Sequence, residues 1–164
     1  MARAERVDYV SCEEFPAVIP EFAGRATIVL HGRPPTRRLL RSLVRQSELL
    51  VAADGGAHAV LAAGLRPTAI VGDLDSFDRV KYPLPQGTQL CQVAEQESTD
   101  ADKAIRWTLG ATPARDLVLT GTQSDELDHV LGTLSVAARY AGSCRLRSFP
   151  NGWGMRILPL RARL

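Results

Sequence analysis

The stretch VAADGGAHAVLAAGLRPTAIVGDLDSF, residues 51–77, decides the fold. It predicts a strand, a turn, a short alanine-rich helix and a second strand, because two apolar runs flank a helix that Gly64 and Pro67 end. Two parallel strands joined by a helix have their carboxyl ends at the same edge of a sheet. The stretch therefore predicts an α/β fold whose sheet edge collects the residues that follow each strand.

Acidic residues follow both of these strands. Asp54 comes directly after the first strand, and Asp73 and Asp75 come directly after the second. We expect the three carboxylates to converge at the sheet edge, where they would repel one another. A fold keeps such a cluster mainly when a cation or polar partners neutralise it. Asp73 and Asp75 lie two residues apart in a turn, so they cannot be explained as part of the polar face of a helix.

The rest of the chain continues the alternation of strands and helices. The patterns predict strands at 26–30, 87–93 and 117–120, and helices at 34–46, 99–110 and 124–140. On the last helix we expect an apolar stripe of Leu127, Val130, Leu131, Leu134 and Ala138. Residues 144–158 predict a β-hairpin with an Asn-Gly turn. The predicted fold class is α/β, a Rossmann-like, mostly parallel sheet with helices on both faces that ends in a β-hairpin.

Length and composition fit one soluble globular domain. The 164 residues suffice for a single α/β core and are too few for two ordinary domains. We expect residues 1–25 to form an N-terminal extension or an edge strand, and residues 26–164 to form the domain. The net charge of +2 gives no argument for a nucleic-acid or membrane partner. No apolar run approaches the length of a membrane span.

Cysteine usage and the N-terminus bear on the compartment. Three cysteines without Cys-x-x-Cys spacing argue against a disulfide framework and a zinc site, and they fit a reducing cytoplasm. The N-terminus carries Glu5 and Asp8 and lacks the apolar segment of a secretory signal. We therefore expect a cytoplasmic enzyme.

The same sheet edge gathers further acids and anion binders. Asp100 and Asp128 lie at helix starts on that edge, although each alone also suits the positive end of a helix. Five acids together favour Mg²⁺, which requires hard oxygen ligands and bridges carboxylates to substrate phosphates. Gly55 and its neighbour Gly56 would let backbone amides approach a phosphate, and Lys103 lies one turn into the Asp100 helix. The set indicates phosphoryl-type transfer.

Other catalytic classes lack their motifs. The sequence has neither a Walker A motif nor a GxGxxG fingerprint, which argues against ordinary P-loop enzymes and dinucleotide dehydrogenases. It shows no nucleophile elbow and no Ser-His-Asp order. His129 is a candidate base, but a helical histidine beside an apolar stripe is more often structural.

Several blocks in the right order resemble the catalytic domain of thiamine pyrophosphokinase over roughly residues 26–158. They are ADGGAH at 53–58, the turn at 64–67, VGDLDSF at 71–77, QESTDADKA at 96–104, and LDH at 127–129 after Gly121. The GDxDS block is the most diagnostic. The resemblance implies transfer of a pyrophosphoryl group from ATP to the hydroxyl of thiamine, giving thiamine diphosphate and AMP, with Mg²⁺ as cofactor.

The resemblance also implies roles for individual residues. The metal and phosphates would be held by Asp73, Asp75 and Asp100, with Asp54 near the metal or the thiamine in the same catalytic cluster. The residues that would contact ATP are Gly55, Gln96, Thr99, Lys103, Gly121 and Asp128.

Three features depart from the family pattern. Ser124, Asp125 and Glu126 stand where the family usually has glycines and an arginine. Thr133 stands where asparagine is common. The family's C-terminal β-sandwich, which helps to bind thiamine and forms a homodimer, is expected to be absent because the chain ends after one hairpin. Two alternatives stay open: a related Mg²⁺-nucleotide enzyme with another small acceptor, and a non-catalytic nucleotide-binding relative.

Overall fold

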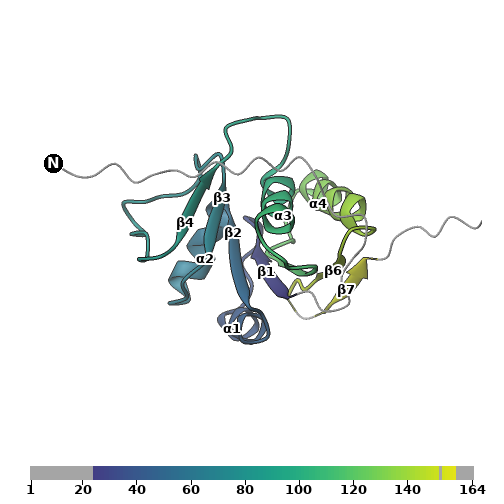
Figure 1. Cartoon of the computed structure of the whole chain (residues 1–164), viewed down its shortest axis with the longest axis horizontal. Coiled ribbons are helices and arrows are strands. Elements are labelled where there is room, and N and C mark those ends of the chain that lie inside the picture. The colour runs from purple at the N-terminus through teal and green to yellow at the C-terminus, as the bar shows by residue number, and fades with distance from the viewer. Residues whose placement is uncertain (1–23, 152, 158–164) are drawn as a thin grey trace, which may run out of the picture.

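The computed structural model describes residues 24–151 and 153–157 (Figure 1). The strands are β1 Arg25–Val29, β2 Leu49–Ala53, β3 Ala69–Gly72, β4 Gln89–Gln92, β5 Asp116–Thr120, β6 Arg145–Ser148 and β7 Met155–Ile157. The helices are α1 Arg37–Arg45, α2 Ala57–Ala62, α3 Asp100–Ala111 and α4 Leu127–Tyr140, with a 3₁₀ turn η1 at Asp54–Gly56. The predicted N-terminal extension or edge strand lies outside the described residues, except for Gly24 and Arg25, where β1 begins.

Within the described ranges the strands form one seven-stranded sheet in the order β4-β3-β2-β1-β5-β6-β7. The neighbouring strands are parallel except for β6 and β7, which pair antiparallel. The helices α1 and α2 lie on one face of the sheet, and α3 and α4 lie on the other (Figure 1). The predicted Rossmann-like α/β sheet with a closing hairpin is confirmed. In the same described ranges no helix is long and apolar enough to cross a bilayer.

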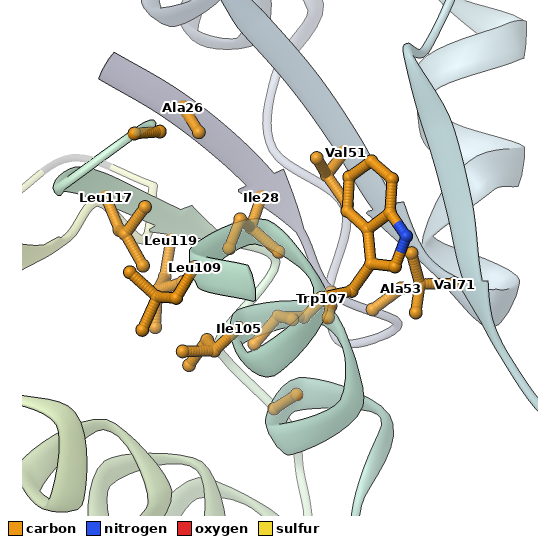
Figure 2. Packing of buried hydrophobic residues seen from close by; sticks show 14 of the residues in the cluster. Ala26, Ile28, Val51, Ala53, Val71, Ile105, Trp107, Leu109, Leu117 and Leu119 are labelled. Atoms are coloured by element: carbon orange, nitrogen blue, oxygen red, sulfur yellow. The ribbon is translucent and has the colours of Figure 1, made fainter. Parts of the chain in front are cut away.

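Successive strand residues pack into two separate cores, because side chains alternate between the faces of a strand. In β1, Ile28 belongs to the core beneath α3 and α4, whereas Val29 belongs to the core beneath α1 and α2. Figure 2 shows Trp107 of α3 lying over Val51 and Val71 of neighbouring strands. Because both faces are covered, the neighbouring strands β2 and β3 are continuous apolar runs with no polar side.

Side-chain caps fix where two of the helices begin. The Thr99 hydroxyl accepts the N–H of Asp102 at 3.3 Å, as the capping pattern predicted. The Thr36 hydroxyl accepts the N–H of Leu39 at 3.3 Å, so α1 begins after Thr36 rather than at the preceding prolines. These caps matter to the site because the start of α3 lies at the carboxyl edge of the sheet.

The predicted inner stripe of α4 is wrong. Leu127 is 71% exposed and Leu131 is 56% exposed, whereas the buried residues of the helix are Val136 and Ala137. The residues of α4 that line the cleft described below are Asp128, His129, Gly132 and Thr133, and neither Leu127 nor Leu131 is among them. The helix therefore turns a different side toward the cleft and the core than the predicted stripe.

The hairpin forms, whereas the predicted Asn-Gly turn includes residue 152, which lies outside the described residues. Pairing ends at Ser148 with Met155, so residues 149–154 separate the two strands. Asn151 fastens this loop to the start of α1. Its Nδ2 donates to the carbonyl of Pro34 at 3.0 Å, and its Oδ1 accepts the N–H of Thr36 at 2.9 Å. These contacts of Asn151 tie the loop between β6 and β7 to the segment that begins α1.

Candidate functional site

A cleft opens at the carboxyl edge of the sheet where β1 and β5 lie side by side. The helices that follow these two strands cover opposite faces, and such a switch point leaves a crevice between the turns. The cleft measures about 360 Å³ and is lined by the turns after β1 and β5 and by the starts of α3 and α4. Gly121 lets the turns meet: its φ is +70°, and a Cβ there would lie 2.3 Å from the carbonyl oxygen of Leu30.

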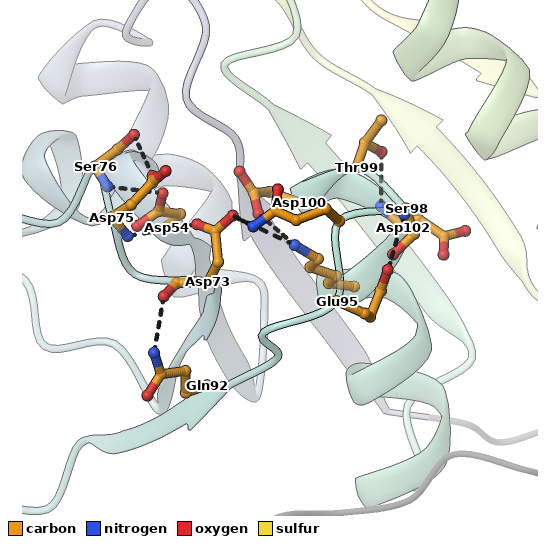
Figure 3. Close-up of polar contacts among 12 residues, drawn as sticks. Asp54, Asp73, Asp75, Ser76, Gln92, Glu95, Ser98, Thr99, Asp100 and Asp102 are labelled. Carbon is orange, nitrogen blue, oxygen red and sulfur yellow. Dashed lines mark hydrogen bonds and ion pairs between the residues drawn. The ribbon is translucent and has the colours of Figure 1, made fainter.

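Three carboxylates meet beside this cleft, as the sequence predicted. One oxygen from each of Asp54, Asp73 and Asp75 lies within 4.8 Å of the others, and Figure 3 shows the three side chains gathered beyond the strand ends. Asp54 is buried, and its Oδ2 accepts the N–H of Ser76 at 3.2 Å. Its Oδ1 is also buried but has no hydrogen-bond partner. A buried oxygen without a hydrogen-bond partner destabilises the fold unless a ligand binds to it.

The backbone holds these carboxylates in sparsely populated conformations. Asp54 has a φ of +40° and Leu74 a φ of +66°, and such residues cost about 1–3 kcal/mol each unless the surroundings fix them. Gly72 permits the close approach of β3 to the cluster. A Cβ on Gly72 would lie 2.8 Å from the Cβ of Asp54 and 3.1 Å from Oδ1 of Asp100. A larger residue at this position would push the acids apart.

Burial and neighbouring charge set the protonation of the cluster. Burial raises the pKa of Asp54 to about 6, and the charges of Asp100, Asp73 and Asp75 add to the rise against the Ser76 hydrogen bond. Burial also works to raise the pKa of Asp73. Hydrogen bonds from the Asp75 N–H and from Gln96, together with the charge of Lys103, outweigh it and lower that pKa.

Lys103 supplies the cation that the chain itself places in the cluster. Its Nζ lies 3.6 Å from Oδ2 of Asp73 and 3.7 Å from Oδ1 of Asp100, and its side chain is only 2% exposed. Burial raises the pKa of Asp100, and the charge of Lys103 opposes that rise. One ammonium among four carboxylates leaves a surplus of negative charge, which favours binding of a cation.

The walls of the cleft are tied together behind the acids. Asp102, buried in the first turn of α3, accepts hydrogen bonds at Oδ1 from Arg139 Nη2 at 2.9 Å and from the Tyr140 hydroxyl at 2.8 Å. Both donors belong to α4. This contact fixes the start of α3, which carries Thr99 and Asp100, relative to the helix that forms the opposite wall.

The remaining predicted residues surround the cluster at different depths. Gln96 Nε2 donates to Oδ2 of Asp73 at 3.1 Å. Thr99 and Gly121 line the cleft, and Asp128 lines it from the α4 side. Gly55 is buried against His31, where a Cβ would lie 2.4 Å from Nδ1 of that ring. Packing alone therefore requires a glycine at position 55, and the predicted ATP contacts of these residues stay predictions.

Sequence reasoning did not pick out two histidines near the site. His31 lines the cleft at the end of β1, and His58 lies in the first turn of α2 with its ring centroid 6.1 Å from that of His31. Signals for both were present. His31 directly follows a predicted strand, and His58 ends the ADGGAH block.

The residues that depart from the family pattern lie at different places around the cleft. Ser124 and Thr133 line it. Glu126 is outside the lining and its side chain is 70% exposed, with Oε2 3.5 Å from Nε2 of His129. Asp125 is also exposed and pairs with Arg33. The charge reversal at Glu126 therefore faces solvent rather than the interior of the cleft.

Comparison with known families agrees with this geometry. The family model for the catalytic domain of thiamin pyrophosphokinase matches residues 40–147, which span the acid cluster, α3 and most of the cleft. The chain belongs to this family. None of the curated proteins compared with the chain matches it significantly.

Solved structures of thiamin pyrophosphokinases share the fold. The enzyme from Geobacillus thermodenitrificans is 25% identical, with a TM-score of 0.61 over 76% of this chain and 59% of that one. The Bacillus subtilis enzyme is 24% identical, with a TM-score of 0.59 over 76% and 60%. The Candida albicans enzyme is 17% identical, with a TM-score of 0.63 over 77% and 58%. The chain thus spans about three fifths of the length of these enzymes.

Proposed function

We propose that the protein transfers a pyrophosphoryl group from ATP to the hydroxyl of thiamine, giving thiamine diphosphate and AMP, with Mg²⁺ at the acid cluster. Membership of the thiamin pyrophosphokinase family supports the reaction class. The observation that carries the proposal is the buried, unpartnered Oδ1 of Asp54 beside Asp73 and Asp75, at the edge of the cleft.

The residues present fit a magnesium ion. Asp54, Asp73 and Asp75 each offer one carboxylate oxygen within a span of 4.8 Å, and Mg²⁺ prefers hard oxygen ligands of this kind. When bound, the ion would neutralise charge on the phosphates and on the oxygens of the reacting bond. Lys103 would keep Asp73 charged and would hold the carboxylates of Asp73 and Asp100 in place, because its ammonium lies close to both.

The cleft supplies the place for the nucleotide. Its walls combine the turns after β1 and β5 with the first turn of α3, whose backbone N–H groups carry partial positive charge. In the proposed reaction the thiamine hydroxyl attacks the β-phosphorus, and the bond between the α,β-bridging oxygen and the β-phosphorus breaks to release AMP. The hydroxyl proton goes to a carboxylate of the cluster. Asp100 lines the cleft, and its raised pKa suits it to accept this proton.

The test is thiamine-dependent AMP formation. The protein is incubated with ATP, Mg²⁺ and thiamine, and AMP and thiamine diphosphate are separated and quantified. Asp75→Asn should lose at least about a hundredfold in rate, since loss of charge stabilisation at one such group costs that much. The matched control is Asp125→Asn, which changes an exposed acid outside the cluster and should keep wild-type activity. If the rate of AMP formation does not depend on thiamine, the assignment of thiamine as the acceptor is wrong.

A related Mg²⁺-nucleotide enzyme with a different small acceptor is the second candidate. Among the described residues, the rings that line the cleft are the imidazoles of His31 and His129, and no Phe, Tyr or Trp joins them. A cationic aromatic acceptor is usually held by aromatic faces. Testing other hydroxylated acceptors in the AMP assay separates the two candidates. The division of the chain into an extension and one domain, a homodimer and a cytoplasmic location stay predictions.

A further inference from the structure

His58 supports the carboxylate loop from the side of α2. Its Nε2 accepts the backbone N–H of Asp78 at 3.1 Å. Its ring also stacks on that of Tyr82, with 4.9 Å between centroids and 26° between planes, and lies 6.0 Å from the ring of Phe77. One side chain on a helix thus contacts three successive parts of the segment that follows β3.

That segment is short and tightly wound, so a restraint at Asp78 is transmitted to the acids. Asp78 Oδ1 accepts the N–H groups of Val80 and Lys81, each at 3.0 Å, and the Asp78 carbonyl accepts that of Tyr82 at 3.0 Å. Only Ser76 and Phe77 separate Asp78 from Asp75 in the chain. The Ser76 N–H already donates to Asp54, which leaves this stretch fixed at both ends.

The hydrogen bond defines the state of the ring. A nitrogen that accepts an N–H carries no proton, so the neutral ring must have its proton on Nδ1. Burial lowers the pKa of His58, and the nearby His31 lowers it further, while Asp78 works the other way. The neutral form is therefore the one that the surroundings favour at neutral pH.

We propose that His58 is a positioning residue for the metal-binding loop: its Nε2 fixes the Asp78 amide and thereby orients Asp73 and Asp75 toward a shared divalent cation. This inference rests on the metal site of the proposed function. It adds a role for a residue that belongs to neither the carboxylate cluster nor the cleft lining.

Two substitutions of His58 test its hydrogen-bond acceptor and its ring stack separately. His58→Gln keeps an oxygen that can accept the Asp78 N–H but loses the stack, whereas His58→Phe keeps the stack and loses the acceptor. Mn²⁺ binding to each folded variant is measured by calorimetry, with folding checked by circular dichroism. We expect His58→Phe to bind Mn²⁺ about three- to tenfold more weakly, the worth of one hydrogen bond, and His58→Gln to stay within about threefold of wild type.

The control for general loss of stability is Leu43→Ala. Leu43 is a buried residue of α1 that lines a separate small groove, so this variant should keep wild-type Mn²⁺ affinity. Wild-type affinity in His58→Phe would overturn the proposal. So would equal losses in His58→Phe and His58→Gln, or the same loss in Leu43→Ala.

A spectroscopic measurement on the unmodified chain tests the inference without any variant. Nitrogen NMR of the imidazoles should show His58 at pH 7.5 as the neutral form protonated at Nδ1. A proton on Nε2, in either the neutral or the charged ring, would overturn the proposal. If the wild-type protein binds no Mn²⁺, the metal site of the proposed function falls, and the NMR result still decides whether His58 holds the loop.

Discussion

Two buried acids at opposite ends of the same sheet have opposite surroundings. Asp116 lies at the amino end of β5, and its oxygens accept hydrogen bonds from Arg25 Nε at 2.9 Å and from Arg147 Nη2 at 2.8 Å. Asp54 lies at the carboxyl end of β2, with other acids around it and one oxygen without a partner. The chain supplies counter-charge to Asp116 and withholds it from Asp54.

The pKa shifts follow this difference. Burial works to raise both values. At Asp116 the hydrogen bonds and charges of Arg147 and Arg25 outweigh burial and hold the pKa below its ordinary value. At Asp54 burial prevails and the pKa rises to about 6. A buried acid that serves the fold is neutralised by its own chain, whereas one that serves a ligand is left to be neutralised by that ligand.

The largest expected effect is on the structural member of this pair. Asp116→Ala leaves two partly buried arginines without their acid and should lower the free energy of unfolding by about 3 kcal/mol. Mn²⁺ binding to the folded variant should be unchanged, because Asp116 lies at the other end of the sheet. Chemical denaturation measures the first quantity and calorimetry the second. Asp125→Ala, at an exposed ion pair, is the control and should change stability far less.

For Asp54, the functional member of the pair, we expect a substitution to change the free energy of unfolding in the opposite direction. Asp54→Asn should raise the free energy of unfolding at pH 7.5, without metal, by about 2–3 kcal/mol, because the pKa of Asp54 is raised by about two units and each unit is worth about 1.4 kcal/mol. The native state holds its proton up to about pH 6, whereas the unfolded chain releases it near pH 4. Wild-type stability should therefore fall as pH rises through this window. Denaturation at pH 5 and 7.5 tests both points, and a destabilised Asp54→Asn would contradict them.

Much of the environment of Asp54 could be predicted from sequence. The two apolar runs flanking residues 54–68 fixed the parallel strands, and the edge rule then placed Asp54 beside Asp73 and Asp75. The predicted N-cap at Thr99 is also present, whereas the Asp102 carboxylate, which the capping-box pattern would turn back to Thr99, accepts from Arg139 and Tyr140. These features follow from residues close together in the chain, where local spacing determines geometry.

The failures involve contacts between distant parts of the chain. Leu127 and Leu131 lie at helical spacing, but α4 turns another of its sides toward the cleft and the core, so both leucines are exposed. Asn151 is held by the start of α1, a contact that its local sequence does not indicate. The ring stack of His58 with Tyr82 joins residues whose separation follows no periodic pattern.

The next effect concerns pH and metal together. Because Asp54 must be ionised to hold a cation, Mn²⁺ affinity should rise by up to about tenfold per pH unit below pH 6 and level off above it. Titrations at pH 5, 6 and 7.5 measure this slope. The Asp54→Asn variant should bind Mn²⁺ more weakly than the wild type, and its affinity should not show this rise with pH. A pH-independent wild-type affinity would show that Asp54 is not a ligand.

The smallest effect tests whether an arginine near the cleft can neutralise ligand charge as Arg147 neutralises Asp116. Glu126→Arg should strengthen ATP binding by about two- to threefold at low salt, because it removes a repulsive charge and adds a donor at an exposed position. Calorimetric titration with ATP measures the change. Weaker binding would mean that Glu126 has a role of its own beside His129.

The central claim is that the carboxylates left without counter-charge form a cation site for a nucleotide. The most direct measurement is calorimetric titration of Mg-ATP into wild type, Asp73→Asn and Asp75→Asn, with circular dichroism to confirm the fold. We predict binding by the wild type that needs Mg²⁺, and no detectable binding by either variant, although both stay folded because neither side chain belongs to the buried cores. Unchanged Mg-ATP affinity in Asp73→Asn and Asp75→Asn would contradict the account.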